Sequence, residues 1–369
     1  MKLRFAPLTL LAALTAAAYL TGSALAQNQA DTMLAKPMFV RMQPHLRADV
    51  QTAVTKLPTW NGSFIFQSKP YKYNMVGTAP STGTSTTIPV FIIPLKMVYK
   101  IGTTTVTFDP QHKLKNGQTV VQNTVASPIF QSGIDFMQGG TDLGNTQYID
   151  AFQRGNFWKT VKLKPGYHLL LGAPTILPEI TISVPAADGG VGTEFGMKVG
   201  LADGNWFDGK VQAIIAGNSK IAPNTLPIFL TYNVYLTDPS FGCCVGGYHS
   251  AFGSVSAPQS YSYSTYIGKT GAFAQDVSVL SHEIGEWADD PLVVNFNGNN
   301  TPCGALEVGD PEESFANFGT FPYTLNGFTY NLQDLTWLPY FGAPTTMSAN
   351  MWLTFQGNPF GMTICSQGS

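Results

Sequence analysis

The last hundred residues of this 369-residue chain contain no lysine and no arginine. Lys269 is the final basic residue and ten carboxylates follow it, whereas residues 27–269 carry eighteen basic and twelve acidic side chains. Phosphate groups are repelled by a surface this acidic, which argues against nucleic acid and anionic membranes as partners. Two explanations of the asymmetry remain open. The acidic portion docks onto the basic portion within one fold, or bound cations neutralise the acids.

Long apolar runs are missing beyond the first 26 residues, so no later segment offers the roughly 20 apolar residues that span a membrane. The first 26 residues combine two basic side chains, an apolar run from Phe5 to Leu20, and a final Ala-Leu-Ala. This pattern is typical of a secretory signal peptide, cut here before Gln27. We therefore expect a secreted or periplasmic mature chain without a membrane span.

Charged residues are scarce, at 11% of the chain, while glycine, proline and aromatic residues are frequent. This composition is typical of a β-rich exported protein with ordered loops. The order of predicted elements indicates an α+β fold with a mixed, β-rich sheet and packed helices. We divide the chain into the signal peptide, residues 1–26, an N-terminal β-rich lead-in, residues 27–85, and a main domain, residues 86–369.

Hydrophobic periodicity places the elements along the chain. Strands are predicted for residues 62–73 as a pair, for 87–101 with a hairpin partner across Gly102, and for 226–236. Helices are predicted for residues 44–57, 127–137, 146–158, 205–217 and, with the clearest pattern, 270–290, which ends before Pro291.

Cysteine is also rare, with four residues, all in the last third of the chain. An exported protein meets conditions in which disulfides persist. A bond between the adjacent Cys243 and Cys244 would be strained, so we expect each to pair with Cys303 or Cys365, in an order that the sequence leaves open. Zinc binding by these thiols is the weaker alternative, because the paired ligand spacing is missing.

The segment SVLSHEIGEWADDP, residues 278–291, concentrates titratable side chains on the predicted helix 270–290. His282 and Glu286 are one helical turn apart and face one point, and Glu283 lies beside them. Leu280 and Ile284 anchor the opposite side. Negative charge near a helix C-terminus is disfavoured by about 0.3–1 kcal/mol per residue, so a cation is expected to compensate. We interpret the cluster as a metal site.

The pattern H-E-x-x-E differs from the H-E-x-x-H of zinc hydrolases by a carboxylate at the second ligand position. Zinc remains the expected ion, although a carboxylate makes the site more tolerant of Ca²⁺ or Mn²⁺. GALEVGDPEE, residues 304–313, supplies Glu307 and Asp310 as further oxygen donors. We place Glu307 with His282 and Glu286 as metal ligands, and Glu283 as the general base.

The other histidines are predicted to have plainer roles. His249, in GGYHS, and His168 are expected to be hydrogen-bonded packing residues, with His249 also a candidate extra ligand or oxyanion stabiliser. His45 and His112 are expected at the surface.

HEIGEWADDPLV, LEVGD and FTYNLQDLTWLPYF together resemble two groups of proteins. The helix with a downstream glutamate is similar to zincin metallopeptidases whose third ligand is a glutamate. The whole set, with GGYHS, resembles the plant EXORDIUM/phosphate-induced secreted proteins over roughly residues 226–341. The resemblance implies a secreted, zincin-like fold with a metal site at His282, Glu286 and Glu307.

Three functions follow as hypotheses. The first is a secreted zinc-dependent hydrolase, most simply a peptidase, acting on a peptide or other extracellular substrate. The second is a secreted, metal-stabilised binding or cell-surface protein of EXORDIUM-like type that cleaves nothing. The third is a glycoside hydrolase that uses two carboxylates of the cluster.

Overall fold

The computed structural model describes residues 42–47, 56–66, 68–138, 141–239, 242–269, 274–293, 308, 320–333, 336–337, 352–353 and 359–360. All of them belong to one compact unit, residues 37–369. The predicted signal peptide lies outside the described residues, as do Cys303, Glu307, Asp310 and Cys365. Within the described ranges, the helices are too short or too polar to cross a membrane. The fold is α+β and rich in strands, as the sequence predicts.

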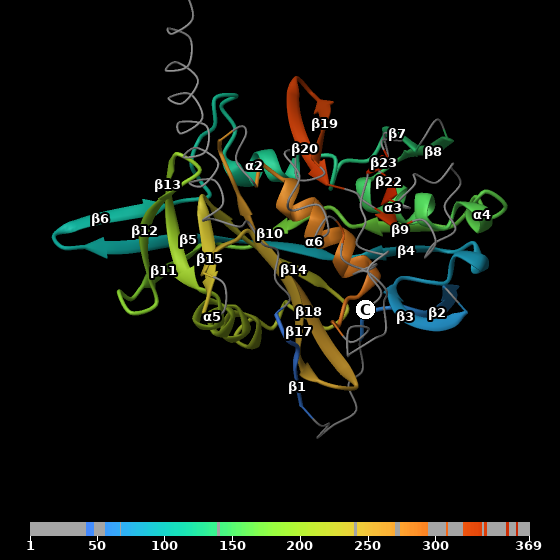
Figure 1. The fold of residues 1–369 in the computed structure, drawn as a ribbon, viewed down its shortest axis with the longest axis horizontal. Coiled ribbons are helices and arrows are strands. Elements are labelled where there is room, and N and C mark those ends of the chain that lie inside the picture. Colours follow the sequence, from blue (N-terminus) through green and yellow to red (C-terminus); the bar gives the residue numbers. More distant parts are fainter. Residues whose placement is uncertain are drawn as a thin grey trace, which may run out of the picture. The chain divides into compact units, whose positions relative to one another are not determined.

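An eight-stranded mixed sheet is the largest element of the fold (Figure 1). Its order is β1-β17-β18-β14-β5-β10, and β6 and β11 also pair with β5. β14 is parallel to both β5 and β18, β17 is antiparallel to β18, and β1 adds in parallel beside β17. The strands are β1 (His45–Arg47), β5 (Val90–Ile101), β6 (Thr104–Phe108), β10 (Thr175–Ile176), β11 (Ile180–Val184), β14 (Leu226–Tyr232), β17 (Gly247–Ser254) and β18 (Ala257–Tyr266).

Smaller sheets complete the β-structure of the described residues. A four-stranded sheet has the order β12-β13-β15-β16, with β12 (Gly189–Glu194), β13 (Met197–Asp203), β15 (Val234–Asp238) and β16 (Gly242–Val245). The two-stranded pairs are β2 (Thr59–Phe66) with β3 (Lys69–Val76), β4 (Ser85–Ile88) with β9 (His168–Leu171), β7 (Ile134–Gln138) with β8 (Thr141–Thr146), and β19 (Thr320–Leu325) with β20 (Phe328–Gln333). β21 (Thr336–Trp337), β22 (Trp352–Leu353) and β23 (Pro359–Phe360) form a three-stranded sheet.

Several helices pack around these sheets, and side-chain caps begin two of them. Thr119 and Gln122 form a capping box at the start of α2, and the Asp203 carboxylate accepts the Trp206 N–H at the start of α5. The helices are α2 (Val120–Val125), α3 (Tyr148–Asn156), α4 (Trp158–Val161), α5 (Gly204–Ala216) and α6 (Ser278–Asp289), with a 3₁₀ turn at Pro80–Thr82.

The main sheet separates two hydrophobic cores because successive side chains of a strand point to opposite faces. In β14, Ile228 and Leu230 belong to the core that contains Ile284 of α6, whereas Phe229 belongs to the core that contains Phe207 of α5. The first five residues of β14, 226–230, are all apolar and buried, which matches a strand covered on both sides. The α6 face and the α5 face are named after these helices below.

Local predictions succeeded where the turn chemistry was explicit. The strand pair at residues 62–73 is confirmed as β2–β3, and the hairpin across Gly102 is confirmed as β5–β6, with Gly102 at φ +58°. The helices at 146–158 and 205–217 are confirmed as α3 and α5.

Three predicted elements differ in the structure. The helix at residues 127–137 is wrong, because Gly133 turns with φ +84° and β7 begins at the next residue. The helix at 44–57 is wrong for residues 45–47, which pair with β17 as β1. The strand at 226–236 is two strands in different sheets, separated at Asn233 with φ +54°.

The prediction that Cys243 and Cys244 each form a disulfide with Cys303 or Cys365 is also wrong. The two residues are bonded to each other in β16, so neither sulfur atom is left for Cys303 or Cys365. A half-cystine forms one disulfide bond, which excludes the expected cross-links from this pair.

Candidate metal centre

Helix α6 carries the H-E-x-x-E segment and is buried along its whole length. Helix α6, orange in Figure 1, packs against β17 and β18 and also against β3 and β20. Leu280, Ile284 and Trp287 bury their side chains in the α6-face core, and Trp287 Nε1 donates to Ser260 Oγ at 3.0 Å. The predicted anchoring by Leu280 and Ile284 is confirmed. The helix is shorter than predicted, since it begins at Ser278.

Glu286 lies between two histidines that come from different elements. Its Oε1 is 3.0 Å from Nε2 of His282, one turn earlier on α6, and its Oε2 is 3.3 Å from Nδ1 of His249 on β17. All three side chains are at most 4% exposed. One carboxylate therefore faces two imidazoles in a site closed to bulk water.

The second nitrogen of each imidazole meets an oxygen acceptor. His282 Nδ1 is 2.6 Å from Oε1 of Gln333, the last residue of β20, and His249 Nε2 is 3.1 Å from the carbonyl oxygen of Asp290. A carbonyl oxygen accepts only, so these ring nitrogens carry protons and donate. In a neutral imidazole, the other nitrogen then has a lone pair, as a metal ligand requires.

These contacts set the electrostatic problem of the site. With both imidazoles neutral, a lone pair of each ring faces a lone pair of the Glu286 carboxylate, which is repulsive. A cation between these atoms makes the same arrangement attractive, because nitrogen and oxygen donors then coordinate it. Protonating both histidines is the alternative way to balance the charge. The donor set fits a divalent metal ion with imidazole and carboxylate ligands.

Glu283 is the second carboxylate of the cluster. Its Oε2 is 3.5 Å from His249 Nδ1, and the side chain is 1% exposed. Among the described residues, neither Glu283 oxygen accepts a hydrogen bond. Burying a carboxylate without such bonds is costly unless a nearby cation stabilises it. One donor atom each from His249, Glu283 and Glu286 lies within 4.8 Å of the others.

Gly247 on β17 makes room for Glu283. A Cβ atom at this position would lie 2.7 Å from Glu283 Oε1 and 2.8 Å from the carbonyl oxygen of Tyr263. Any side chain there would push the helix and the strand apart. The glycine of GGYHS thus permits the close approach that brings His249 to the two glutamates.

Burial and mutual charge shift the titration of the cluster. Burial raises the pKa of Glu283 to about 7, His249 opposes the rise, and the charge of Glu286 adds to it. Burial also acts to raise the pKa of Glu286, but the two histidines outweigh it and hold that pKa below its usual range. For His249, burial lowers the pKa and the two carboxylates more than offset this, so the pKa is raised. Of the two carboxylates, Glu286 is therefore the one that is fully ionised at neutral pH.

The remaining acids of α6 are used differently. Asp289 Oδ1 accepts a hydrogen bond from Gln153 Nε2 of α3 at 2.8 Å, and burial raises the Asp289 pKa above its usual range. Asp290 ends the helix, where its N–H donates to the Glu286 carbonyl and its own carbonyl accepts from His249. Of the four carboxylates in the segment, the structure brings Glu283 and Glu286 together with His249.

Among the described residues, no lysine or arginine supplies the positive charge expected to compensate these acids. Within these ranges, the ion pairs of Glu283 and Glu286 are made with histidines, and no lysine or arginine pairs with either glutamate. The described residues therefore show no docking of lysine or arginine from the basic portion onto Glu283 or Glu286. A bound cation and protonated histidines remain as the two sources of the compensating charge.

The predicted ligand set is His282, Glu286 and Glu307. The structure brings His282 and Glu286 together, whereas Glu307 lies outside the described residues and its role stays a prediction. The neighbouring Val308 is buried, and a Cβ atom on Gly285 would lie 3.0 Å from its Cγ2. The chain at Val308 therefore touches α6 one residue before Glu286.

His249 and Gln333 are the site residues that sequence reasoning underrated or missed. His249 is predicted mainly as a packing residue. The sequence signal for its place in the site is the glycine pair before Tyr248, because glycine lets the strand approach another element closely. Gln333 lies in the segment FTYNLQ, whose sequence contributes to the resemblance but predicts no role for this side chain. The predicted packing role of His168 agrees with its hydrogen bond to Asp150, at 2.8 Å.

Comparison with known proteins identifies no relative: no protein-family model, no curated protein and no solved structure matches the chain.

Proposed function

We propose that the chain is a zinc-dependent hydrolase of the peptidase type, exported by its predicted signal peptide. Glu286, His282 and His249 would hold the metal, with Glu307 as the further ligand predicted from the sequence. The observation that carries the proposal is the placement of both oxygens of Glu286 against ring nitrogens of two histidines, each oriented by an acceptor on its other nitrogen.

Each residue then has a distinct task. A zinc ion in this position would supply Lewis-acid polarisation and lower the pKa of a bound water. Gln333 and the Asp290 carbonyl orient the imidazoles through their N–H groups. Glu283 is the proton acceptor, because its carboxylate lies next to the ligands and is not needed to orient either imidazole.

A second function has its own support. The side chains of His249, His282, Glu283 and Glu286 are at most 4% exposed, and a closed site is typical of structural metal ions, which keep no position open for a substrate. In that case Glu283 is a fourth ligand, and the protein is a metal-stabilised binding protein.

Elemental analysis of the purified mature protein tests the metal. We expect about one zinc per chain, and about a 100-fold or greater loss of zinc affinity in Glu286→Gln, since even outer-shell changes cost 10–100-fold. Asp276→Asn is a matched control, because it is a buried carboxylate beside the start of α6 that contacts Asn331 instead of the cluster. A wild type that folds without any bound divalent ion would refute the proposal.

Glu283→Gln separates the two functions. As a proton acceptor, Glu283 is expected to be dispensable for zinc content and essential for hydrolysis of a peptide library. As a structural ligand, it is expected to be needed for the metal. A Glu283→Gln variant that keeps both its zinc and the wild-type hydrolysis rate would show that neither assignment is right.

A further inference from the structure

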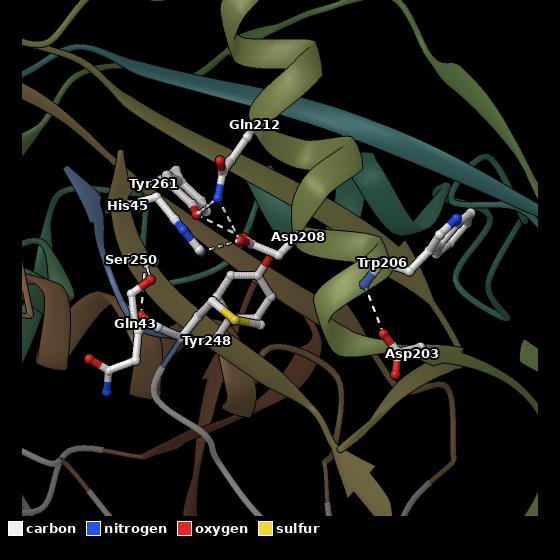
Figure 2. A network of polar contacts seen from close by, with 10 residues as sticks. Gln43, His45, Asp203, Trp206, Asp208, Gln212, Tyr248, Ser250 and Tyr261 are labelled. Carbon is white, nitrogen blue, oxygen red and sulfur yellow. Dashed lines mark hydrogen bonds and ion pairs between the residues drawn. The ribbon is translucent and has the colours of Figure 1, made fainter. Parts of the chain in front are cut away.

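Asp208 of α5 gathers polar groups on the sheet face opposite the metal centre (Figure 2). Its Oδ1 accepts hydrogen bonds from the hydroxyls of Tyr248 at 2.9 Å and Tyr261 at 2.7 Å. Its Oδ2 accepts from Gln212 Nε2 at 2.7 Å and lies 3.6 Å from His45 Nε2. Asp208 is 2% exposed, so four groups converge on a buried carboxylate.

Burying a carboxylate between a helix and a sheet carries a large desolvation penalty. Apolar side chains of similar volume often stabilise such a position equally well or better. The surrounding α5-face core already contains Phe207, Val211 and Tyr263, which hold α5 against the strands without charge. Asp208 adds what apolar packing lacks, because its hydrogen bonds are directional and fix the positions of the Tyr248 and Tyr261 hydroxyls.

Tyr248 connects this carboxylate to the metal centre through a single peptide unit. Tyr248 and His249 are consecutive in β17, so their side chains leave opposite faces of the sheet. Tyr248 reaches Asp208 on the α5 face, and His249 reaches Glu286 on the α6 face. A twist of β17 about its own axis would move both side chains together, and metal ligands tolerate displacements of only about 0.2 Å.

We propose that Asp208 is a positioning residue for the metal centre: by holding the hydroxyl of Tyr248, it fixes the twist of β17 and thereby the direction of His249. This inference rests on the proposed function, in which His249 is a ligand. Asp208 touches no metal or substrate and acts through the strand. Tyr261 contacts the same oxygen but belongs to β18, which carries no ligand.

Paired variants test the inference in the full-length mature protein. Tyr248→Phe removes one hydroxyl from the strand that carries His249, and Tyr261→Phe removes the matching hydroxyl from the neighbouring strand. We expect Tyr248→Phe to weaken zinc binding by between about threefold and tenfold, which corresponds to the net free energy of one ordinary hydrogen bond. We expect a smaller change in Tyr261→Phe, and an altered visible spectrum of the cobalt-substituted protein in Tyr248→Phe alone.

Asp208→Ala is expected to weaken zinc binding by about tenfold or more. Its control is Asp203→Ala, which removes the cap of the same helix and destabilises the protein without touching β17. Asp203→Ala is therefore expected to lower the melting temperature and leave zinc affinity unchanged. Equal zinc affinity and equal cobalt spectra in wild type, Asp208→Ala and Tyr248→Phe would overturn the inference.

A readout that needs no metal keeps the two proposals distinguishable. After a chelator has removed the metal, the NMR signals of the His249 ring ¹⁵N atoms are expected to shift in Tyr248→Phe and to remain nearly unchanged in Tyr261→Phe. A wild type that binds no zinc would refute the proposed function, and the ring signals would still decide whether Asp208 positions His249. Unchanged His249 signals in Tyr248→Phe and Asp208→Ala would refute the positioning role.

Discussion

Tyr248 and His249 are neighbours in sequence and point to opposite sides of the main sheet: the Tyr248 hydroxyl donates to Asp208 at 2.9 Å, while the His249 ring lies 3.3 Å from Glu286. One strand thus joins two buried polar clusters. Both clusters contain carboxylates, and both depend on contacts between residues far apart in the chain. Substitutions that displace β17 or α6 are therefore expected to affect metal binding even where they touch no ligand.

Metal removal is expected to destabilise the protein. The buried carboxylates of Glu283 and Glu286 lose their counter-charge when the ion leaves, and a ligand at 1,000 times its Kd contributes about 4 kcal/mol. For a chain of this size we expect the melting temperature to fall by at least about 5 °C after treatment with a strong chelator. Circular dichroism melts measure the shift, and adding zinc back should reverse it. Identical melts with and without chelator would contradict the prediction.

Gln333→Leu is expected to weaken zinc binding about 10–100-fold, because the acceptor that orients His282 is removed. The backbone contacts of Gln333, to the Ser281 and Tyr148 hydroxyls, do not depend on its side chain. Competition with a chromogenic chelator measures the affinity. Gln259→Leu is the matched control, since it removes a buried amide that bonds to backbone carbonyls away from His282. A zinc affinity equal to that of wild type would show that Gln333 does not orient the ligand.

Gly247→Ala is expected to reduce both stability and zinc affinity. The added methyl group would lie 2.7 Å from Glu283 Oε1, and overpacking of this kind costs typically 1–3 kcal/mol. We expect a lower denaturation midpoint and a zinc affinity reduced by about tenfold. Gly190→Ala on β12 is the control, because a Cβ atom there meets no atom within 4 Å. If both alanine variants behaved alike, the close approach at Gly247 would not matter.

Asp276 is expected to make stability fall as the pH rises. Burial raises its pKa to about 7 from an ordinary value of 3.8, and hydrogen bonds from Asn331 and the Val277 N–H only partly oppose this. The folded protein therefore binds the proton more tightly than the unfolded chain. The resulting stability is complete below about pH 4 and is lost as the pH rises through about 7.

Asp276→Asn replaces this carboxyl with an uncharged side chain of the same shape. The difference in unfolding free energy between wild type and variant is expected to change by up to about 4 kcal/mol between pH 4 and pH 8, in favour of the variant at high pH. Urea denaturation at a series of pH values measures it. Groups common to both proteins cancel in the difference, so a flat difference would mean that Asp276 has an ordinary pKa.

The parts of the site that could be predicted are those encoded by local spacing. His282 and Glu286 are one turn apart on any helix, and the periodic apolar residues of α6 identify that helix without further information. Glycine turns likewise locate the β5–β6 hairpin. Where apolar residues fit two periods, prediction failed: residues 127–137 read as a helix, although Gly133 interrupts the segment and β7 follows.

The parts that could not be predicted depend on contacts across the chain. His249 lies 41 residues before Asp290, whose carbonyl it contacts, and Gln333 lies 51 residues after His282. Neither separation has a period that a sequence pattern could reveal. Strain in a bond between adjacent cysteines favours other partners for Cys243 and Cys244, yet the structure bonds them to each other.

By itself, the sequence determined that an acidic helix places an imidazole and two carboxylates on one side, because helical geometry is a local property of the chain. It also determined a strand-rich α+β fold through its composition and alternation. Only the tertiary structure decided that His249 completes the cluster and that Tyr248 turns toward Asp208. Strand alternation separates those two side chains, but which helix covers each face is set by long-range packing.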